Sequence, residues 1–169
     1  MGKLIPDTSV VTFYRRSLTP ADALIVDAGE NPVPAQDNKK INLDEAEWVT
    51  LDGSAKAVRL GAAPGLAGIL AFPVWVSDRR DAAAALKITV IHGPHCGKTS
   101  LFDTTVGAYT PGQALTVKLI GGKSILTKAT PASSEAINAI AEGPAAGATA
   151  EYPNGFLPYT TVGAGGILP

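Results

Sequence analysis

Sulfur and charge are both scarce in this chain of 169 residues. Its single cysteine, Cys96, excludes a disulfide within the chain and is typical of a protein that folds in a reducing compartment. Aspartate, glutamate, lysine and arginine together make up 17% of the residues, whereas a typical soluble domain has about 25%. We therefore expect another molecule to cover part of the surface.

The chain also lacks an excess of either charge and any long apolar run. Its formal net charge of -1 provides no basic surface of the kind that binds nucleic acid or an acidic membrane. No apolar stretch approaches the roughly 20 residues of a membrane-spanning helix, and residues 1–10 do not have the pattern of a signal peptide. We expect neither a nucleic-acid nor a membrane partner.

Glycine and proline, by contrast, are abundant, with 18 and 13 residues, and they interrupt the chain too often for long helices. The pattern is clearest in residues 106–129. A Thr-Pro-Gly-Gln turn at 110–113 precedes an apolar strand at 114–120, and a Gly-Gly loop then leads to a return strand at 124–128. We predict an all-β fold: a single β-barrel or sandwich domain with an extended N-terminal arm.

Further strands are predicted where short β-branched and aromatic runs lie between turn signals. They fall at 48–51, 55–60, 69–77, 87–92, 99–102, 136–142 and 156–162. Because proline cannot donate to a ladder, Pro73 is expected on an edge strand or a bulged one. Residues 1–20 are predicted to be the N-terminal arm or an edge strand, and residues 21–169 to form the β domain.

Residues 91–100, IHGPHCGKTS, contain the end of a phosphate-loop motif. The first glycine of that motif would fall at position 92, which is His92. Pro94 also removes a backbone N–H from the loop that would hold the phosphate. We predict a hairpin turn here, with its return strand at 99–102, rather than a nucleotide site.

The same stretch contains three side chains that can bind metals: His92, His95 and Cys96. The sequence has no fourth cysteine or histidine, and structural zinc normally takes four protein ligands in separated pairs. A Cys–His nucleophile would also need a third residue to orient the histidine. We therefore expect no catalytic residue, metal or cofactor, and we predict that the protein is not an enzyme.

Both ends of the chain carry apolar residues without a strong helical period. An extended terminus of this kind can add a strand to the open sheet edge of a neighbouring molecule. We expect the two ends to bind a partner chiefly through backbone and apolar contacts. The candidate residues are Val10, Val11, Phe13, Tyr14, Arg15, Arg16, Ile167 and Leu168.

Six segments in the later part of the chain share a style of short strands and tight turns. They are FPVWVSDRRD (72–81), KITVIHG (87–93), TSLFD (99–103), YTPGQALTVKLIGGKSILTKA (109–129), AINAIAEGP (136–144) and FLPYTTVG (156–163). With these segments, residues 69–169 resemble the decoration, or cement, proteins of tailed-bacteriophage capsids. The resemblance rests on turns and strands and includes no catalytic motif.

The resemblance implies a structural protein of the virion. Such a protein is a β-barrel or β-tulip domain, forms a homo-oligomer such as a dimer or trimer, and binds the major capsid protein. It would be made in the host cytoplasm and located on the capsid surface, where it would stabilise the shell by bridging neighbouring subunits. The resemblance implies no cofactor and no chemistry.

A carbohydrate- or surface-binding β-sandwich module of a virion is the alternative. The aromatic side chains of Trp48, Trp75, Tyr152 and Tyr159 are candidates for stacking on sugar rings. Rings buried in the core would be unavailable for that role, whereas exposed coplanar rings would favour it.

Overall fold

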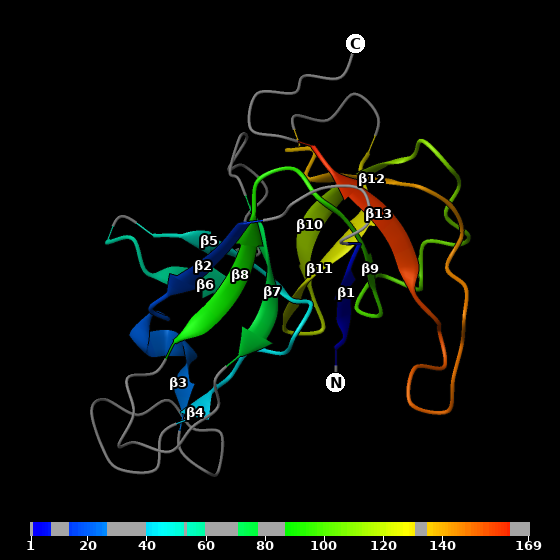
Figure 1. Cartoon of the computed structure of the whole chain (residues 1–169). Helices are drawn as coiled ribbons and strands as arrows, with labels where there is room; N and C mark the ends of the chain where they lie inside the picture. Colours follow the sequence, from blue (N-terminus) through cyan, green and yellow to red (C-terminus); the bar gives the residue numbers. More distant parts are fainter. Residues whose placement is uncertain are drawn as a thin grey trace.

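The chain folds into two open antiparallel β-sheets that pack against each other (Figure 1). The computed structural model describes residues 2–7, 14–26, 40–52, 54–59, 71–77, 87–130 and 135–162. These residues form thirteen strands and one short 3₁₀ turn, η1 (Asp22–Leu24), and contain no α-helix. The predicted all-β class is confirmed. The arrangement is sandwich-like and is not a closed barrel.

The larger sheet has six strands, and its neighbours are antiparallel throughout. Its inner face is apolar because alternate residues of each strand point to that side. Across the sheet the strands are β1 (Leu4–Pro6), β9 (Cys96–Thr99), β13 (Leu157–Thr161), β12 (Ala139–Ala141), β10 (Ala114–Ile120) and β11 (Lys123–Lys128).

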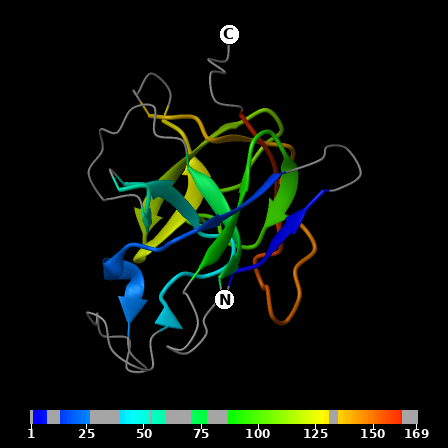
Figure 2. The same cartoon turned by 60° about the vertical axis from the view of Figure 1, so that its left-hand side comes forward.

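The smaller sheet has five strands: β2 (Tyr14–Leu18), β8 (Ile88–His92), β7 (Phe72–Ser77), β5 (Trp48–Leu51) and β6 (Ala57–Arg59). A short pair, β3 (Ile25–Val26) and β4 (Lys40–Ile41), lies beside it. The sheet curls, so that the chain following β2 reaches β6: Ala21 N donates to Ala57 O, and Ala57 N donates to Thr19 O. Figure 2 brings β2 to the front of the molecule.

Two apolar clusters form the core, one on each side of the smaller sheet. Ile91 of β8 and Trp48 of β5 belong to the cluster that lies under the six-stranded sheet. Ile88, Val90 and Val49, from the same two strands, belong to the second cluster. Strands β5 and β8 are therefore buried on both faces, which explains why they are apolar at consecutive positions.

The segment that carries the clearest sequence signal has the predicted structure. Gln113 N donates to Thr110 O at 3.2 Å across the first turn, where Gly112 has φ of +81°. Gly121 and Gly122, with φ of +58° and +76°, form the two-residue loop between β10 and β11. Positive φ at both positions is the geometry of a type I′ turn, which glycine adopts without steric strain.

Strands β8 and β9 do not form the predicted hairpin. Strand β8 pairs with β2 and β7, whereas β9 pairs with β1 and β13 of the other sheet. The predicted return strand at 99–102 instead occupies Cys96–Thr99. Gly93, with φ of +83°, lies in the corner where the chain changes sheets. Turn chemistry predicts that the chain bends but does not determine which strand the next segment joins.

Pro73 lies on an interior strand with a bulge, so the bulged alternative is correct and the edge alternative is wrong. Strand β7 pairs with β5 on one side and β8 on the other, and its register with β8 shifts between Val74 and Val76. Pairing with β8 starts at Val74, one residue after the proline. The ladder between β7 and β8 therefore does not include Pro73, the residue that has no N–H to donate.

The N-terminal residues contribute to both sheets at their edges. Leu4 in β1 is 2% exposed and packs in the first cluster, and Leu18 in β2 is 4% exposed and packs in the second. Strands β1 and β2 are each the last strand of their sheet. Residues 8–13, between these strands, lie outside the described residues.

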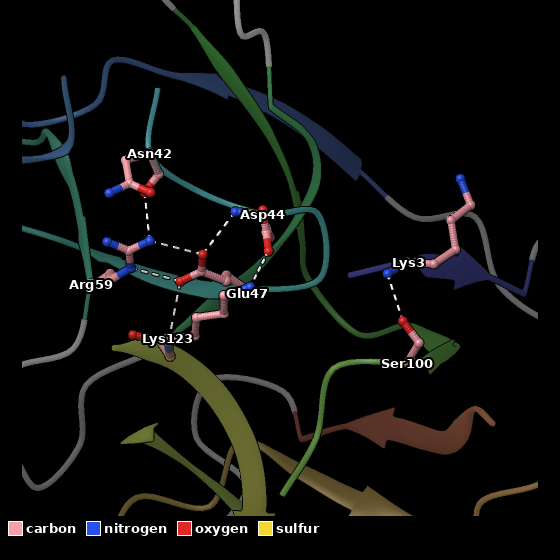
Figure 3. A network of polar contacts seen from close by, with 8 residues as sticks. Lys3, Asn42, Asp44, Glu47, Arg59, Ser100 and Lys123 are labelled. Atoms are coloured by element: carbon pink, nitrogen blue, oxygen red, sulfur yellow. Dashed lines mark hydrogen bonds and ion pairs between the residues drawn. The ribbon is translucent and has the colours of Figure 1, made fainter. Parts of the chain in front are cut away.

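A buried carboxylate connects the two sheets (Figure 3). Glu47, which is fully buried, accepts hydrogen bonds from Arg59 Nε at 2.8 Å and Arg59 Nη2 at 3.0 Å. It also accepts from Asp44 N at 2.8 Å and, across the sheet boundary, from Ser124 N of β11 at 3.3 Å. Asp44 in turn forms an ion pair with Lys123. The segment before β5 thus bonds directly to β6 and β11.

We predict that Glu47→Ala lowers the free energy of unfolding by about 3–5 kcal/mol, because it leaves Arg59 without its buried partner. Urea unfolding of the full chain measures the change. Glu45→Ala is the matched control, since the Glu45 side chain is 22% exposed and, among the described residues, accepts from Leu4 N and pairs with Lys3. We expect that variant to lose about 1 kcal/mol. Equal losses for the two variants would contradict a central role for Glu47.

Candidate functional site

Three of the four edges of the two sheets are covered by other groups. At β1, Glu45 Oε1 accepts from Leu4 N at 3.1 Å. At β6, Ala57 exchanges hydrogen bonds with the residues that follow β2. At β11, Glu47 accepts from Ser124 N, and Asp103 N donates to Leu126 O at 2.8 Å. The backbone groups bonded in this way are not available to another strand, which makes these three edges less favourable for strand addition.

Asp103 fixes the cover over β11. Its carboxylate accepts from Thr105 N at 2.9 Å, Thr105 Oγ1 at 2.7 Å and Thr127 Oγ1 at 2.9 Å. Burial raises the pKa of Asp103, but these hydrogen bonds and the charge of Lys118 outweigh burial, so the pKa lies below its usual value. Tyr109 adds a hydrogen bond from its hydroxyl to Asp103 O at 2.7 Å.

The edge of β2 has no such cover among the described residues. Tyr14–Leu18 pairs with β8 on one side, in a register that runs from Tyr14 with His92 to Leu18 with Ile88. Arg16 and Ser17 are both exposed. An uncovered strand presents unpaired N–H and C=O groups, which can bind an extended segment of another chain. We call Tyr14–Leu18 the open edge.

The open edge contains three of the eight residues proposed from the sequence as partner-binding: Tyr14, Arg15 and Arg16. The side chain of Arg16 is exposed. The other five residues lie outside the described part of the chain: Val10, Val11, Phe13, Ile167 and Leu168.

The residues of the broken phosphate motif lie in a strand. Gly97, Lys98 and Thr99 belong to β9, which pairs with β1 on one side and β13 on the other. The backbone of a strand with two neighbours is engaged in their ladders, whereas a phosphate loop needs free N–H groups that point at one ligand. The Thr99 hydroxyl donates to Leu101 O at 3.3 Å.

His95 lies in the core, at the corner where the chain changes sheets. It is 2% exposed, and its Nε2 lies 3.1 Å from the hydroxyl of Tyr159, which is fully buried. Its Nδ1 lies 3.1 Å from Gly93 O. A carbonyl only accepts, so Nδ1 carries the proton and Nε2 accepts from the tyrosine hydroxyl. Both ring nitrogens are satisfied in this neutral form.

Burial lowers the pKa of His95 and outweighs the opposite effect of the hydrogen bond to Gly93 O. Burial, with a smaller contribution from Cys96, raises the pKa of Tyr159. Cys96 itself is half-buried, and its Sγ lies 3.2 Å from Thr160 Oγ1. The Thr160 hydroxyl donates to Glu142. These pairs connect β9, β13 and β12, and each has a structural explanation.

Among the described residues, no group of three or more histidine, cysteine, aspartate or glutamate side chains is arranged to hold a metal ion. No helix in that part of the chain is long and apolar enough to cross a membrane. Of the four aromatic candidates for sugar stacking, Trp48 and Tyr159 pack edge to face in the core at 5.7 Å between ring centroids. Tyr152 is half-buried, and the side chain of Trp75 lies outside the described residues.

Sequence reasoning did not identify the buried carboxylates of Glu47 and Asp103. The signal for Glu47 is a single acidic residue between Ala46 and Trp48, next to a predicted strand. A charged residue at such a position is rarely buried unless it is paired. Its partner, Arg59, is twelve positions away, so the pairing is not evident before the strands are placed.

No protein-family model, curated protein or solved structure matches the chain.

We predict that the wild-type protein loses stability as the pH falls below about 6.5, the ordinary pKa of histidine. Because the native pKa of His95 is lowered, the unfolded state binds the proton more readily. The stabilisation is fully present above about pH 6.5 and is lost as the pH falls through the native pKa, with a slope of at most about 1.4 kcal/mol per pH unit.

Urea unfolding between pH 7.5 and pH 5.5 tests this, with His95→Gln as the comparison. Glutamine can form hydrogen bonds but does not titrate, and His92 is still present in the variant. We expect a smaller pH dependence in His95→Gln than in the wild type. Identical slopes would show that His95 does not titrate differently in the folded state.

Proposed function

We propose that this protein is a structural, non-catalytic virion protein that binds the outer surface of a tailed-phage capsid and stabilises the shell by bridging neighbouring subunits. The observation that carries the proposal is the open edge at Tyr14–Leu18, which contrasts with the other three edges of the two larger sheets, where described residues bond to outward backbone groups. The resemblance of residues 69–169 to capsid decoration proteins supplies the partner, the major capsid protein.

Strand addition explains how such a protein would attach. An extended segment of the capsid protein would lie along β2 and continue the five-stranded sheet. Main-chain hydrogen bonds would supply affinity. A protein that binds the assembled shell and not its separated subunits stabilises the shell by mass action. This mechanism needs a firmly held edge strand, and Leu18, buried in the second cluster, anchors β2.

Backbone groups, rather than charges, would dominate the contact. The chain has a net charge of -1 and only 17% charged residues, so it has little basis for long-range attraction. We therefore expect binding to change little with ionic strength, because screening acts on charge pairs and not on strand addition.

Deletion of the N-terminal segment would be a poor test of this proposal. Removing it would also remove β1, whose Leu4 is 2% exposed in the first cluster and whose backbone pairs with β9. A substitution within β2 that blocks the outer edge and leaves the inner ladder intact is more specific.

We predict that one of two proline variants, Arg16→Pro and Ser17→Pro, weakens head binding without loss of stability. Neighbouring residues in a strand direct their N–H groups to opposite sides, so one substitution faces β8 and the other faces the open edge. The inward variant, in which proline replaces an N–H that faces β8, should have a lower melting temperature than the wild type. The outward variant, in which proline replaces an N–H at the open edge, should have the melting temperature of the wild type. It should nevertheless bind heads at least about tenfold more weakly.

Co-sedimentation of the purified full chain with heads of the phage that carries its gene measures binding. Arg16→Gln is the control, because it removes the charge and keeps the N–H; it should bind within about twofold of the wild type in low and high salt. Normal binding by the outward proline variant would eliminate the open edge as the attachment site. Failure of the intact protein to bind heads would refute the capsid assignment.

A further inference from the structure

The outer face of the six-stranded sheet is distinct from the open edge. The strand registers define it: residues on this side of β1, β9, β13 and β12, together with Glu142 directly after β12, are exposed or half-buried. Their neighbours in sequence are buried, except Pro6 and Thr161, which are half-buried. Its members are Ile5, Cys96, Lys98, Ile140, Glu142, Pro158 and Thr160. Ile5, at 44%, is the one exposed large apolar side chain among the described residues.

Four of these residues form a row across the strands. Ile5 is opposite Lys98, and Lys98 is opposite Pro158. Glu142 completes the row on the other side, since its N–H donates to Pro158 O at 3.0 Å. Pro158 therefore lies midway between an exposed cation on β9 and an exposed anion directly after β12.

The next row has the same symmetry about β13. Thr160 is opposite Cys96 on one side and Ile140 on the other. In both rows the central residue is on β13. The two residues beside it, which differ in chemistry, are each one strand away from it. The backbones of Lys98 and Glu142 are two strands apart, about 10 Å, with Pro158 between them.

We propose that this outer face binds the same face of a second copy of the chain. The two-fold axis would lie between the two sheets, parallel to β13. Such an axis exchanges the two sides of β13. Lys98 of each copy then faces Glu142 of the other, and Cys96 faces Ile140. The contact is isologous, so the charged pair occurs twice.

Sheet packing is compatible with this arrangement. Two sheets pack face to face about 10 Å apart, a gap that a lysine and a glutamate side chain together can span. Pro158 and Thr160 on the axis are short and allow close approach. The four strands span only about 14 Å, which is below the size of a standard interface. We therefore expect a weak dimer.

Sedimentation equilibrium of the purified full chain, without phage heads, tests the proposal. Lys98→Glu should raise the dimer Kd at least about tenfold, because two attractive pairs become two repulsive ones. Glu142→Lys should have the same effect. The double variant Lys98→Glu/Glu142→Lys restores opposite charges and should return the Kd to within about threefold of the wild type.

Lys87→Glu is the matched control. It changes the net charge by the same amount as Lys98→Glu, from an exposed position just before β8, and should leave the Kd unchanged. Thermal melting of each variant verifies that it is folded. A wild-type protein that remains monomeric up to about 1 mM would overturn the proposal. So would a dimer insensitive to Lys98→Glu, or a double variant that dimerises no better than the single ones.

Because heads are absent from this experiment, its outcome does not depend on capsid binding. A dimer that fails to bind heads would refute the proposed function and support the interface. A monomer that binds heads through β2 would refute the interface and support the proposed function.

Discussion

The buried carboxylate of Glu47 is the interaction on which the arrangement of the two sheets depends. It accepts from Arg59 of β6, from the backbone of Asp44 and from Ser124 N of β11. A buried charge is tolerated only when its partners are in place, so this contact forms only when β6 and β11 are correctly positioned. Apolar packing holds the sheets together without direction, whereas this network fixes how they meet.

The same segment also governs which sheet edges are available. Glu45 covers β1 and Glu47 covers β11, while Asp103 closes the other part of β11. These contacts remove potential sites of strand addition, and the edge of β2 has no equivalent among the described residues. By our proposals, interaction is concentrated at this edge and on the outer face of the six-stranded sheet.

Local signals predicted the turns and most strands but not their partners. Gly112, Gly121 and Gly122 adopt the positive φ that their turn positions predicted, because a turn depends on adjacent residues alone. Strands β8 and β9 are separated by a tight corner, yet they lie in different sheets. A ladder forms between distant segments, and nothing in the ten residues around Gly93 specifies which one. The sequence likewise predicted either a bulged strand or an edge strand at Pro73. Only the pairing of β7 with both β5 and β8 decides between the two.

The sequence by itself determined the all-β class, the turns between β10 and β11, and the lack of a complete phosphate loop or separated metal ligands. These features depend on residue type and short spacing. Tertiary structure alone decided that Glu47 pairs with Arg59, that His95 meets Tyr159 in the core, and that Lys98 and Glu142 lie on either side of β13. Each of these depends on sheet order, which is set by long-range packing and not by local preference.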